Sequence, residues 1–546
     1  MLLRTLSLAL ATLCVLGAHA QNCGARFGNA LCSQGLCCSQ YGSCGSTDEY
    51  CLTSKNCQSN CIDDGPPPPP KGPKPPNIDV GSLYRPPDGV FNGFEMVGYW
   101  SSWAQYYGED PGTPACKKED KHLPENINPF LFTHINYAFA FVSNTNFTII
   151  PHELDDEDLS KRLNNWMKSN NPRSRTSLSL GGWTFTDGPG RFTGGIDYSQ
   201  VFSQLVSTRS NREIFIDSCI DWCRRLGFDG IDLDWEYVGD TSRGGSTSDG
   251  ANFLTLLQEM RAAFRSEASS SGKAELLITV AAPADPAKVA LFDIKACQEY
   301  IDWYNLMSYD FYGNWDPTID STAPVYDTFK PTWSFDSAIH LYLDAGVSAS
   351  KINAGLPAYG RVWTLQDVTR NTPGSQGGPG TAGRCTGLAG YMGWFEIVEI
   401  LNVKDRLTTG DEVFKYVPGD GAYATFDDQW VGFDDSRSVA EKVALIKQYG
   451  LRGGMIWAVD LDTKDYSFTR SVLEGRNSCP KNGDWLPTPA GVTASLLCEN
   501  RSGALGDDAA PQQKRLCKSD ATWDVVDLAD CNKGLMLFQK AKSQCI

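Results

Sequence analysis

The chain has 546 residues, too many for one ordinary domain, so two to four modules are expected. Its composition is that of a globular protein, with 41% hydrophobic, 11% aromatic and 21% charged residues. Because 65 acidic side chains outnumber 48 basic ones and the net charge is −17, the chain has no basic surplus with which to bind a polyanion. This balance argues against a nucleic-acid partner.

The first segment, residues 1–20, has the layout of a secretory signal peptide. A single early Arg4 precedes the apolar run LSLALATLCVLG, and the small residues Ala18 and Ala20 mark a cleavage site. The apolar run is shorter than the roughly 20 residues that a membrane span needs. We therefore predict cleavage after Ala20 and a secreted, extracellular protein with no membrane partner.

Cysteines fall into three groups after Ala20. Eight lie between Cys23 and Cys61, five between Cys116 and Cys385, and five between Cys479 and Cys545. In an oxidising compartment this density indicates disulfides. The two later groups have odd numbers, so one bridge between them or one free thiol in each are the alternatives.

Small modules are expected at both ends of the chain. Residues 21–61 contain too little apolar material for a core and depend on their cysteines. The proline-rich stretch 62–92 follows, and its run IDDGPPPPPKGPKPPNI is expected to adopt polyproline II and to act as a stiff spacer. Residues 477–546 form a second small module with cysteines and turn-forming residues.

Between residues 93 and 476, short β-rich runs alternate with longer amphipathic segments, the pattern of an α/β chain with a parallel sheet. We predict eight strands, which begin near Met96, Thr133, Thr176, Phe228, Leu276, Asp302, Ile352 and Gly453. Eight such strands favour a (β/α)8 TIM barrel. The interval before the last strand exceeds one helix, so an α+β insertion is expected at about 361–430.

The predicted strand FDGIDLDWEY contains three acidic residues at alternate positions near its end. Side chains alternate along a strand, so Asp232, Asp234 and Glu236 share one face and the apolar residues between them share the other. In a parallel barrel the apolar face packs beneath the helices, which directs the three acids into the interior. Buried carboxyls without partners cost too much for a purely structural role. A metal site and a solvated loop are the alternatives, and only five histidines are present as further ligands.

Catalysis explains this spacing better than either alternative. Acids at alternate positions lie about 6–7 Å apart at Cα, so they cannot all ionise freely and share protons. Glu236 is nearest the carboxyl end of the strand, where barrel enzymes have their active sites. A glutamic acid whose pKa is raised by acidic neighbours is suited to protonate a leaving group.

The motif DGIDLDWE resembles the DxxDxDxE signature of family 18 glycoside hydrolases, the chitinases. The companion motifs SLSLGGW, MSYD, PAYGR and GGMIWAVD follow in the family's order. The resemblance implies hydrolysis of β-1,4 bonds between N-acetylglucosamine units, without a cofactor. It also implies a retaining, substrate-assisted mechanism, in which the N-acetyl group of the substrate replaces an enzyme nucleophile.

The resemblance also implies a role for individual residues. The catalytic residues would be Glu236 as general acid and base, Asp234 as the group that orients the N-acetyl group, Asp232 as the proton partner of Asp234, and Tyr309 as donor to the acetamido oxygen. The substrate-binding residues would be Tyr99, Ser179, Trp183, Tyr237, Met307, Asp310, Arg361 and Trp457. On spacing alone, Trp457 and Met307 are equally typical of core residues, and Asp310 of a turn.

The first eight cysteines, with the segment CCSQYGSCGSTDEYC, resemble the hevein-like chitin-binding domain. The resemblance implies the disulfides Cys23–Cys38, Cys32–Cys44, Cys37–Cys51 and Cys57–Cys61. It further implies chitin binding by Ser39 as hydrogen-bond donor and by Tyr41 and Tyr50 as aromatic plates. Ser43 stands where the family has a third aromatic residue, which should weaken binding by about 1 kcal/mol. A zinc cluster is the alternative use of these cysteines.

These observations predict a secreted chitinase whose partners are chitin and N-acetylglucosamine oligomers. Two alternatives remain. One is a chitin-binding lectin without activity, which the presence of Glu236 argues against. The other is the chitinase-like subunit of a secreted killer toxin, in which the C-terminal module would bind a co-secreted protein.

Overall fold

The computed structural model divides the chain into two compact units, residues 1–70 and 71–546. In the first unit it describes residues 23–24, 31–32, 36–41, 43–46, 48–51, 55, 57–59 and 61. In the second it describes residues 72–87, 91, 93–107, 116–117, 120–190, 193–403, 414–475, 478–479, 488–489, 493–497 and 512–516. The predicted signal peptide lies outside the described residues.

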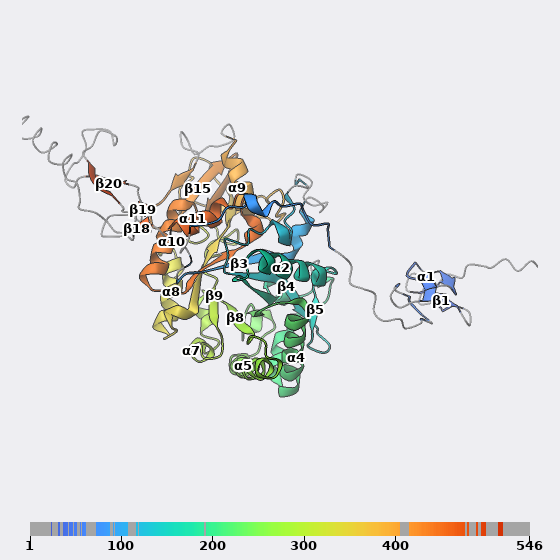
Figure 1. The fold of residues 1–546 in the computed structure, drawn as a ribbon. Helices are drawn as coiled ribbons and strands as arrows, with labels where there is room; N and C mark the ends of the chain where they lie inside the picture. Colours follow the sequence, from blue (N-terminus) through green and yellow to red (C-terminus); the bar gives the residue numbers. More distant parts are fainter. Residues whose placement is uncertain are drawn as a thin grey trace, which may run out of the picture. The chain divides into compact units, whose positions relative to one another are not determined.

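Eight parallel strands of the second unit close into a barrel (Figure 1). They are β3 (Glu95–Ser101), β4 (His134–Val142), β6 (Arg175–Gly181), β7 (Gly230–Asp234), β8 (Leu277–Ala282), β9 (Trp303–Leu306), β10 (Ile352–Pro357) and β17 (Gly453–Trp457). Their order is β3-β17-β10-β9-β8-β7-β6-β4, and β4 pairs with β3 to close the ring. All eight predicted strands are barrel strands, so the predicted (β/α)8 TIM barrel is confirmed.

Helices cover the outside of the barrel (Figure 1). The principal ones are α2 (Asp156–Asn170), α3 (Val201–Ser207), α4 (Arg209–Leu226), α5 (Asp249–Ser271), α8 (Phe335–Asp344), α10 (Ser436–Gln448) and α11 (Ser467–Gly475). The sequence sets both ends of α4, because Thr208 accepts a hydrogen bond from the Asn211 amide (3.2 Å) and Gly227 adopts the left-handed conformation that ends the helix. Its buried face includes Phe215, Cys219, Trp222 and Cys223, which lie at helical spacing.

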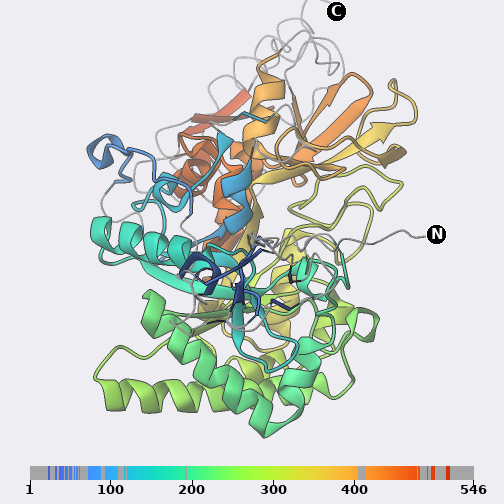
Figure 2. The same cartoon turned by 90° about the vertical axis from the view of Figure 1, so that its right-hand side faces the viewer.

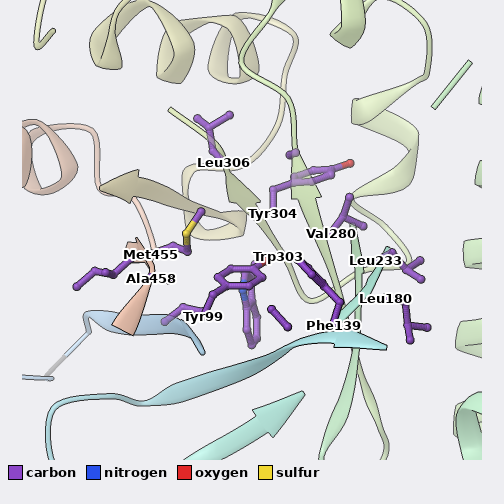
Figure 3. Close-up of a cluster of buried hydrophobic side chains, with 14 of the residues drawn as sticks. Tyr99, Phe139, Leu180, Leu233, Val280, Trp303, Tyr304, Leu306, Met455 and Ala458 are labelled. Carbon is purple, nitrogen blue, oxygen red and sulfur yellow. The ribbon is translucent and has the colours of Figure 1, made fainter. Parts of the chain in front are cut away.

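The two faces of β7 meet different surroundings, as its alternating pattern predicts. Ile231 and Leu233 are almost fully buried in the hydrophobic core. Trp235 continues this outer face and packs on Phe202 of α3 and Phe253 of α5, at ring distances of 5.3 and 5.9 Å. Figure 3 shows the side chains of core residues from several strands, among them Tyr99, Trp303 and Met455. The polar face of β7 therefore points to a barrel interior walled by large side chains.

The insertion between β10 and β17 is an α+β subdomain. Its sheet consists of β11 (Tyr359–Leu365), β12 (Gly377–Pro379), β13 (Tyr391–Gly393), β14 (Lys415–Tyr416), β15 (Ala422–Phe426) and β16 (Gln429–Phe433), and α9 (Trp394–Leu401) packs on β11 and β13. In Figures 1 and 2 this sheet lies on the side of the barrel away from α4 and α5. It spans a few residues more at each end than the predicted 361–430. A disulfide between Cys116 and Cys385 joins it to the β3–β4 connection.

The central cysteines are paired differently from either alternative that the sequence left open. Besides the Cys116–Cys385 bridge, Cys219, Cys223 and Cys297 are free and buried. Three thiols of this group, rather than one, are therefore unpaired. Each lies in or beside a helix that covers the barrel, where a thiol packs as a small apolar side chain.

Part of the predicted spacer lies against the barrel. The Gly72 amide donates to Asp158 of α2 (3.0 Å), and Arg162 of the same helix donates to the Pro73 carbonyl (2.6 Å). Farther along, Asn128 donates to the Tyr84 carbonyl (2.9 Å). These bonds hold residues 72–84 on the second unit, so the predicted spacer 62–92 is not free along its whole length.

In the first unit, β1 (Cys37–Cys38) pairs with β2 (Cys44–Gly45), and α1 (Asp48–Cys51) follows. At the C-terminus, β18 (Ser478–Cys479) pairs with β19 (Thr488–Pro489) and β20 (Thr493–Leu497) with β21 (Gln512–Leu516). The side chains of the predicted C-terminal module lie outside the described residues. Within the described ranges, no helix has the length and apolar character of a membrane span.

Candidate active site

The three acids of the predicted strand are buried together at the carboxyl end of β7. Asp232, Asp234 and Glu236 are 0%, 4% and 8% exposed. The sequence predicted Glu236 at the end of the strand, but β7 ends at Asp234 and Glu236 lies in the turn that follows. The Asp234 carbonyl accepts the last cross-strand bond, from the Gly182 amide (2.8 Å), and the chain then turns. The acids are therefore stacked from the barrel interior, at Asp232, toward its mouth, at Glu236.

A glycine allows β6 to approach this point closely. Gly181 has φ +110°, and a Cβ there would lie 2.2 Å from the Asp234 carbonyl oxygen. Any larger residue would push β6 away from the acids. Gly181, the last residue of β6, thus has a structural function at the site itself.

Asp232 accepts four hydrogen bonds. Tyr99 (2.8 Å) and Ser179 (2.7 Å) donate to its Oδ2, and Thr279 (2.5 Å) and Asn305 (3.1 Å) donate to Oδ1. Burial raises the pKa of Asp232, and these donors oppose the rise because they favour the carboxylate. Tyr99 and Ser179 occupy the positions that the sequence predicted for them, next to the buried acids.

Thr279 and Asn305 were not among the predicted site residues. Both occupy inward positions on the neighbouring strands β8 and β9, and the indole Nε1 of Trp303 donates to the Asn305 side-chain oxygen (3.0 Å), which leaves the amide group to face Asp232. The alternation of the predicted strands LLITVAA and DWYNLMSY placed these two polar side chains inside the barrel. The period of two in these strands would have been enough to predict both residues at the site.

Asp234 has the opposite surroundings. Its Oδ1 is buried and has no hydrogen-bond partner among the described residues. Burial, followed by the charges of Glu236 and Asp232, raises the pKa of Asp234 well above its usual value. The expected proton exchange with Asp232 is not seen as a hydrogen bond between the two carboxyls, because four other donors surround Asp232.

Burial raises the pKa of Glu236 to about 7, against the opposing influence of Arg243 and a hydrogen bond from Tyr237. Its main chain is held as well, since its carbonyl accepts from Arg243 Nε (2.7 Å) and from the Thr186 hydroxyl (2.6 Å). A carboxyl with this pKa exchanges a proton readily near neutral pH, as a general acid and base must.

Burial, followed by the charges of Asp234, Asp310 and Glu236, raises the pKa of the Tyr309 hydroxyl well above the usual value. It is therefore a protonated donor at neutral pH. Its neighbour Met307 is half-buried against the main core, in agreement with the packing alternative.

Asp310 and Arg361 form an ion pair at the insertion. Arg361 Nε donates to Asp310 Oδ1 (2.8 Å), and Arg361 Nη2 lies 2.7 Å from the same oxygen. The Asp310 backbone has φ 60°, the conformation typical of a turn. The guanidinium also lies 4.8 Å from the ring centroid of Trp315, an exposed aromatic residue that the sequence analysis missed. The pair connects the barrel strand end to the insertion.

The two predicted tryptophans differ in exposure. Trp457 is half-buried beside Tyr99, the residue that donates to Asp232, and their ring centroids are 5.5 Å apart. The Trp457 ring also stacks on Phe139, with 5.7 Å between the ring centroids. Trp183 is 52% exposed, and the Arg243 guanidinium lies 3.6 Å from its ring centroid. Trp457 therefore packs among aromatic residues beside the acids, whereas Trp183 is the more exposed of the two.

In the first unit, the disulfides are Cys23–Cys38, Cys32–Cys44, Cys37–Cys51 and Cys57–Cys61, the pairing that the resemblance implied. Tyr41 is 75% exposed and Tyr50 is half-buried. Ser39 is buried, and its hydroxyl oxygen accepts a hydrogen bond from the Ser43 amide (3.3 Å). Of the two predicted tyrosines, Tyr41 is therefore the more exposed.

Disulfides also account for the cysteines that could otherwise bind metal. Among the described residues, two sets of cysteine and acidic side chains are close enough to share an ion, Cys23–Cys32–Cys38 and Cys116–Asp120–Cys385. Every cysteine in both sets is in a disulfide and has no thiolate to offer. The zinc alternative is thereby removed for the cysteines of these two sets.

Comparison with known proteins agrees with these features. The family model of glycosyl hydrolases family 18 matches residues 95–462, and that of the chitin recognition protein matches residues 22–61. Over 381 residues the chain is 36% identical to chitotriosidase-1 of Mus musculus, a match that covers 68% of this chain and 74% of the mouse protein.

Solved structures show the same fold. A catalytic domain of the Group II chitinase of Ostrinia furnacalis is similar with a TM-score of 0.61 and 28% identity, over 73% of this chain and 99% of that one. Human YKL-39, described as a pseudo-chitinase with retained chitooligosaccharide binding, is similar with a TM-score of 0.59 and 27% identity, over 70% of this chain and 99% of that one. This chain belongs to glycosyl hydrolase family 18 and has a chitin recognition domain at its N-terminus.

Proposed function

We propose that this protein is a secreted chitinase that hydrolyses β-1,4 bonds between N-acetylglucosamine units with retention of configuration. The observation that carries the proposal is the environment of Glu236, a buried acid with a pKa of about 7 at the mouth of the barrel. Such a group is protonated often enough near neutral pH to donate to a glycosidic oxygen.

The neighbouring carboxyls support a nucleophile that comes from the substrate. Asp232 is enclosed by four donors beneath the mouth, and Asp310 is paired with Arg361. Burial and the charges of Glu236 and Asp232 raise the pKa of Asp234 well above its usual value, which favours the neutral form, and a neutral carboxyl is a poor nucleophile. Among the described residues, the three carboxyls nearest Glu236 are thus each held in surroundings that disfavour attack on the sugar.

The reaction then proceeds in two displacements at C1. Glu236 gives its proton to the leaving oxygen while the carbonyl oxygen of the 2-acetamido group attacks C1, which breaks the glycosidic bond and forms an oxazolinium ion. Asp234 orients the acetamido group and Tyr309 donates to its oxygen. The Glu236 carboxylate next takes a proton from water, which attacks C1 and reopens the ring. Two inversions give net retention.

The remaining features fit a polymeric substrate that carries N-acetyl groups. Trp457 offers an aromatic floor beside the acids, and the exposed Trp183 offers a further plate for a sugar ring. The N-terminal unit would bind chitin through Tyr41 and raise the local concentration of the enzyme on an insoluble surface. The signal-like segment and the disulfides favour secretion.

A substitution of the acid tests the proposal. Glu236→Gln should lower the hydrolysis of soluble chitotetraose by about 10²–10⁴-fold while leaving its binding detectable. Glu213→Gln is the matched control, because Glu213 is 56% exposed and pairs with Arg209 on the outer surface of α4. Equal activity of wild type and Glu236→Gln would refute the assignment. A wild-type protein that binds chitotetraose without hydrolysing it would be a lectin.

A further inference from the structure

Arg243 contacts several parts of the candidate active site at once. It ends the short helix η9 (Thr241–Arg243), and its side chain is only 12% exposed. Its Nε donates to the Glu236 carbonyl (2.7 Å), and its Nη2 donates to the Trp183 carbonyl (2.6 Å) and the Thr186 hydroxyl (2.9 Å). Since Thr186 also donates to the Glu236 carbonyl (2.6 Å), one guanidinium joins two separate segments of the site.

The same guanidinium covers one face of the Trp183 indole. Its Cζ lies 3.6 Å from the ring centroid, which is the contact distance of a cation stacked on an aromatic ring. The ring is nevertheless 52% exposed, so its other face remains open. A sugar that stacks on Trp183 must use this open face, and the position of the ring then depends on Arg243.

The loop that carries Arg243 is itself anchored. The Asp240 carboxylate accepts from the Ser242 amide (2.9 Å) at the start of η9, and Lys288 forms an ion pair with Asp240 (2.6 Å). These contacts fix the backbone turn from which the Arg243 side chain extends.

We propose that Arg243 is a positioning residue that joins the Glu236 main chain to the Trp183 ring, so that sugar stacking on the open face of Trp183 and alignment of the Glu236 acid are coupled. This inference rests on the proposed function, in which Glu236 is the acid and Trp183 a sugar platform. Arg243 itself need not touch the substrate.

The charge of Arg243 provides a readout that a merely structural role would not change. Groups that act on the Glu236 carboxyl are Asp234 from β7, Tyr237 from the following turn, Tyr309 and Asp310 after β9, and Arg243 from η9. Arg243 lowers the pKa of Glu236, so its removal raises that pKa. The alkaline limb of kcat/KM, which reports loss of the acid's proton, then moves to higher pH.

The test compares Arg243→Met, which removes the charge, with Arg243→Lys, which keeps a charge but not the fork of donors. Arg209→Met is the control, since Arg209 is 80% exposed and pairs with Glu213. With chitotetraose, the Met variant should show an alkaline limb at higher pH and a KM raised roughly tenfold. The Lys variant should keep the limb near its wild-type position but retain the raised KM.

Coupling is measured with Trp183→Ala and the double variant, Trp183→Ala with Arg243→Met. The KM of the double variant should be no higher than that of the worse single variant, because both substitutions remove one interaction. Multiplicative effects, or a wild-type pH profile in the folded Met variant, would overturn the proposal. If the Met variant does not fold, a wild-type KM in the Lys variant is the contrary result.

The same cycle can be followed without catalysis. Calorimetric binding of chitotetraose in a Glu236→Gln background should show the same non-additivity between Trp183 and Arg243. This arm separates the two hypotheses: an inactive wild-type protein refutes the proposed function, whereas additive binding energies refute the positioning role of Arg243.

Discussion

The chitin recognition unit and the barrel are stabilised in different ways. Among the described residues of the small unit, the buried apolar side chains are Cys23, Cys32, Cys37, Cys38 and Cys51, and Leu36 packs against the cluster of Cys23, Cys32 and Cys38. In the barrel, a continuous core of aliphatic and aromatic side chains reaches from β3 to α11. The unit therefore depends on covalent links, whereas the barrel has enough packing to tolerate three buried acids. A large core can tolerate the unfavourable burial of carboxyls, and that burial perturbs their pKa values.

The strongest test of this contrast removes a bridge from the small unit. The Cys37–Cys51 disulfide closes a loop with a sequence separation of 14, and such a bridge contributes about 3 kcal/mol. Replacing both cysteines by serine should unfold the unit and abolish binding to insoluble chitin, while hydrolysis of soluble chitotetraose is unchanged. Cys297→Ser, at a free buried thiol of the barrel, is the comparison and should leave chitin binding intact. Binding that survives loss of the bridge would show that packing suffices in the small unit.

The second test measures what the buried acid costs the barrel. Because the pKa of Glu236 is about 7 in the folded chain and 4.5 is its ordinary value, the folded state binds the proton more tightly than the unfolded state. The free energy of unfolding therefore falls as the pH rises from about 4.5 through 7. Glu236→Gln has no charge to bury and should be more stable than wild type by about 3 kcal/mol at pH 8, with little difference at pH 4.

Chemical unfolding of both proteins at the two pH values provides the measurement. Glu213→Gln, on an exposed helix face, should show no such pH-dependent gain. A gain for Glu236→Gln that is equal at pH 4 and pH 8 would contradict a raised pKa.

A third test removes one of the four donors to Asp232. Thr279→Val keeps the shape of the side chain and deletes the hydrogen bond to Asp232 Oδ1 (2.5 Å). Since this bond lowers the pKa of Asp232, the pKa should rise, and the acidic limb of kcat/KM should move to higher pH with about a tenfold loss of activity. Thr255→Val on α5, whose hydroxyl bonds to the Ala251 carbonyl, is the control. An unchanged pH profile would show that Asp232 does not act through its charge.

The smallest effect is expected at the surface of the small unit. Tyr41→Ala removes an aromatic ring that is 75% exposed, and it should weaken binding to chitin by about 1 kcal/mol without unfolding the unit. Leu31→Ala is the control, because Leu31 is an apolar side chain of similar exposure, 70%. Adsorption isotherms on insoluble chitin measure both. Equal losses for the two variants would point to general apolar contact instead of stacking.

The sequence was sufficient for the barrel and for the location of the acids. The strand runs are short, β-rich and bounded by polar segments, and the period of two in IDLDWE decides which side chains enter the barrel. Tyr99 and Ser179 were assigned to the site through the family resemblance of their motifs, because only Ser179 lies on a strand next to β7, whereas Tyr99 lies on β3, which is not a neighbour of β7. Local patterns of this kind survive in the folded chain because the barrel keeps each strand in register with its neighbours.

What the sequence did not yield depends on contacts between distant segments. The ion pair of Asp310 with Arg361 joins residues 51 positions apart, and Arg243 reaches Trp183 over 60 positions. No periodic pattern in the sequence predicts contacts over such separations. The attachment of Gly72 to α2 was missed for the same reason, since a proline-rich run looks alike whether it is free or docked.

We propose that the nucleophile comes from the substrate and that Glu236 only moves protons. The most direct measurement is the anomeric configuration of the first product of chitotetraose hydrolysis, followed by proton NMR before mutarotation. If the proposed mechanism is correct, the β-anomer forms first. The α-anomer as the first product would mean a single displacement by water and would contradict it.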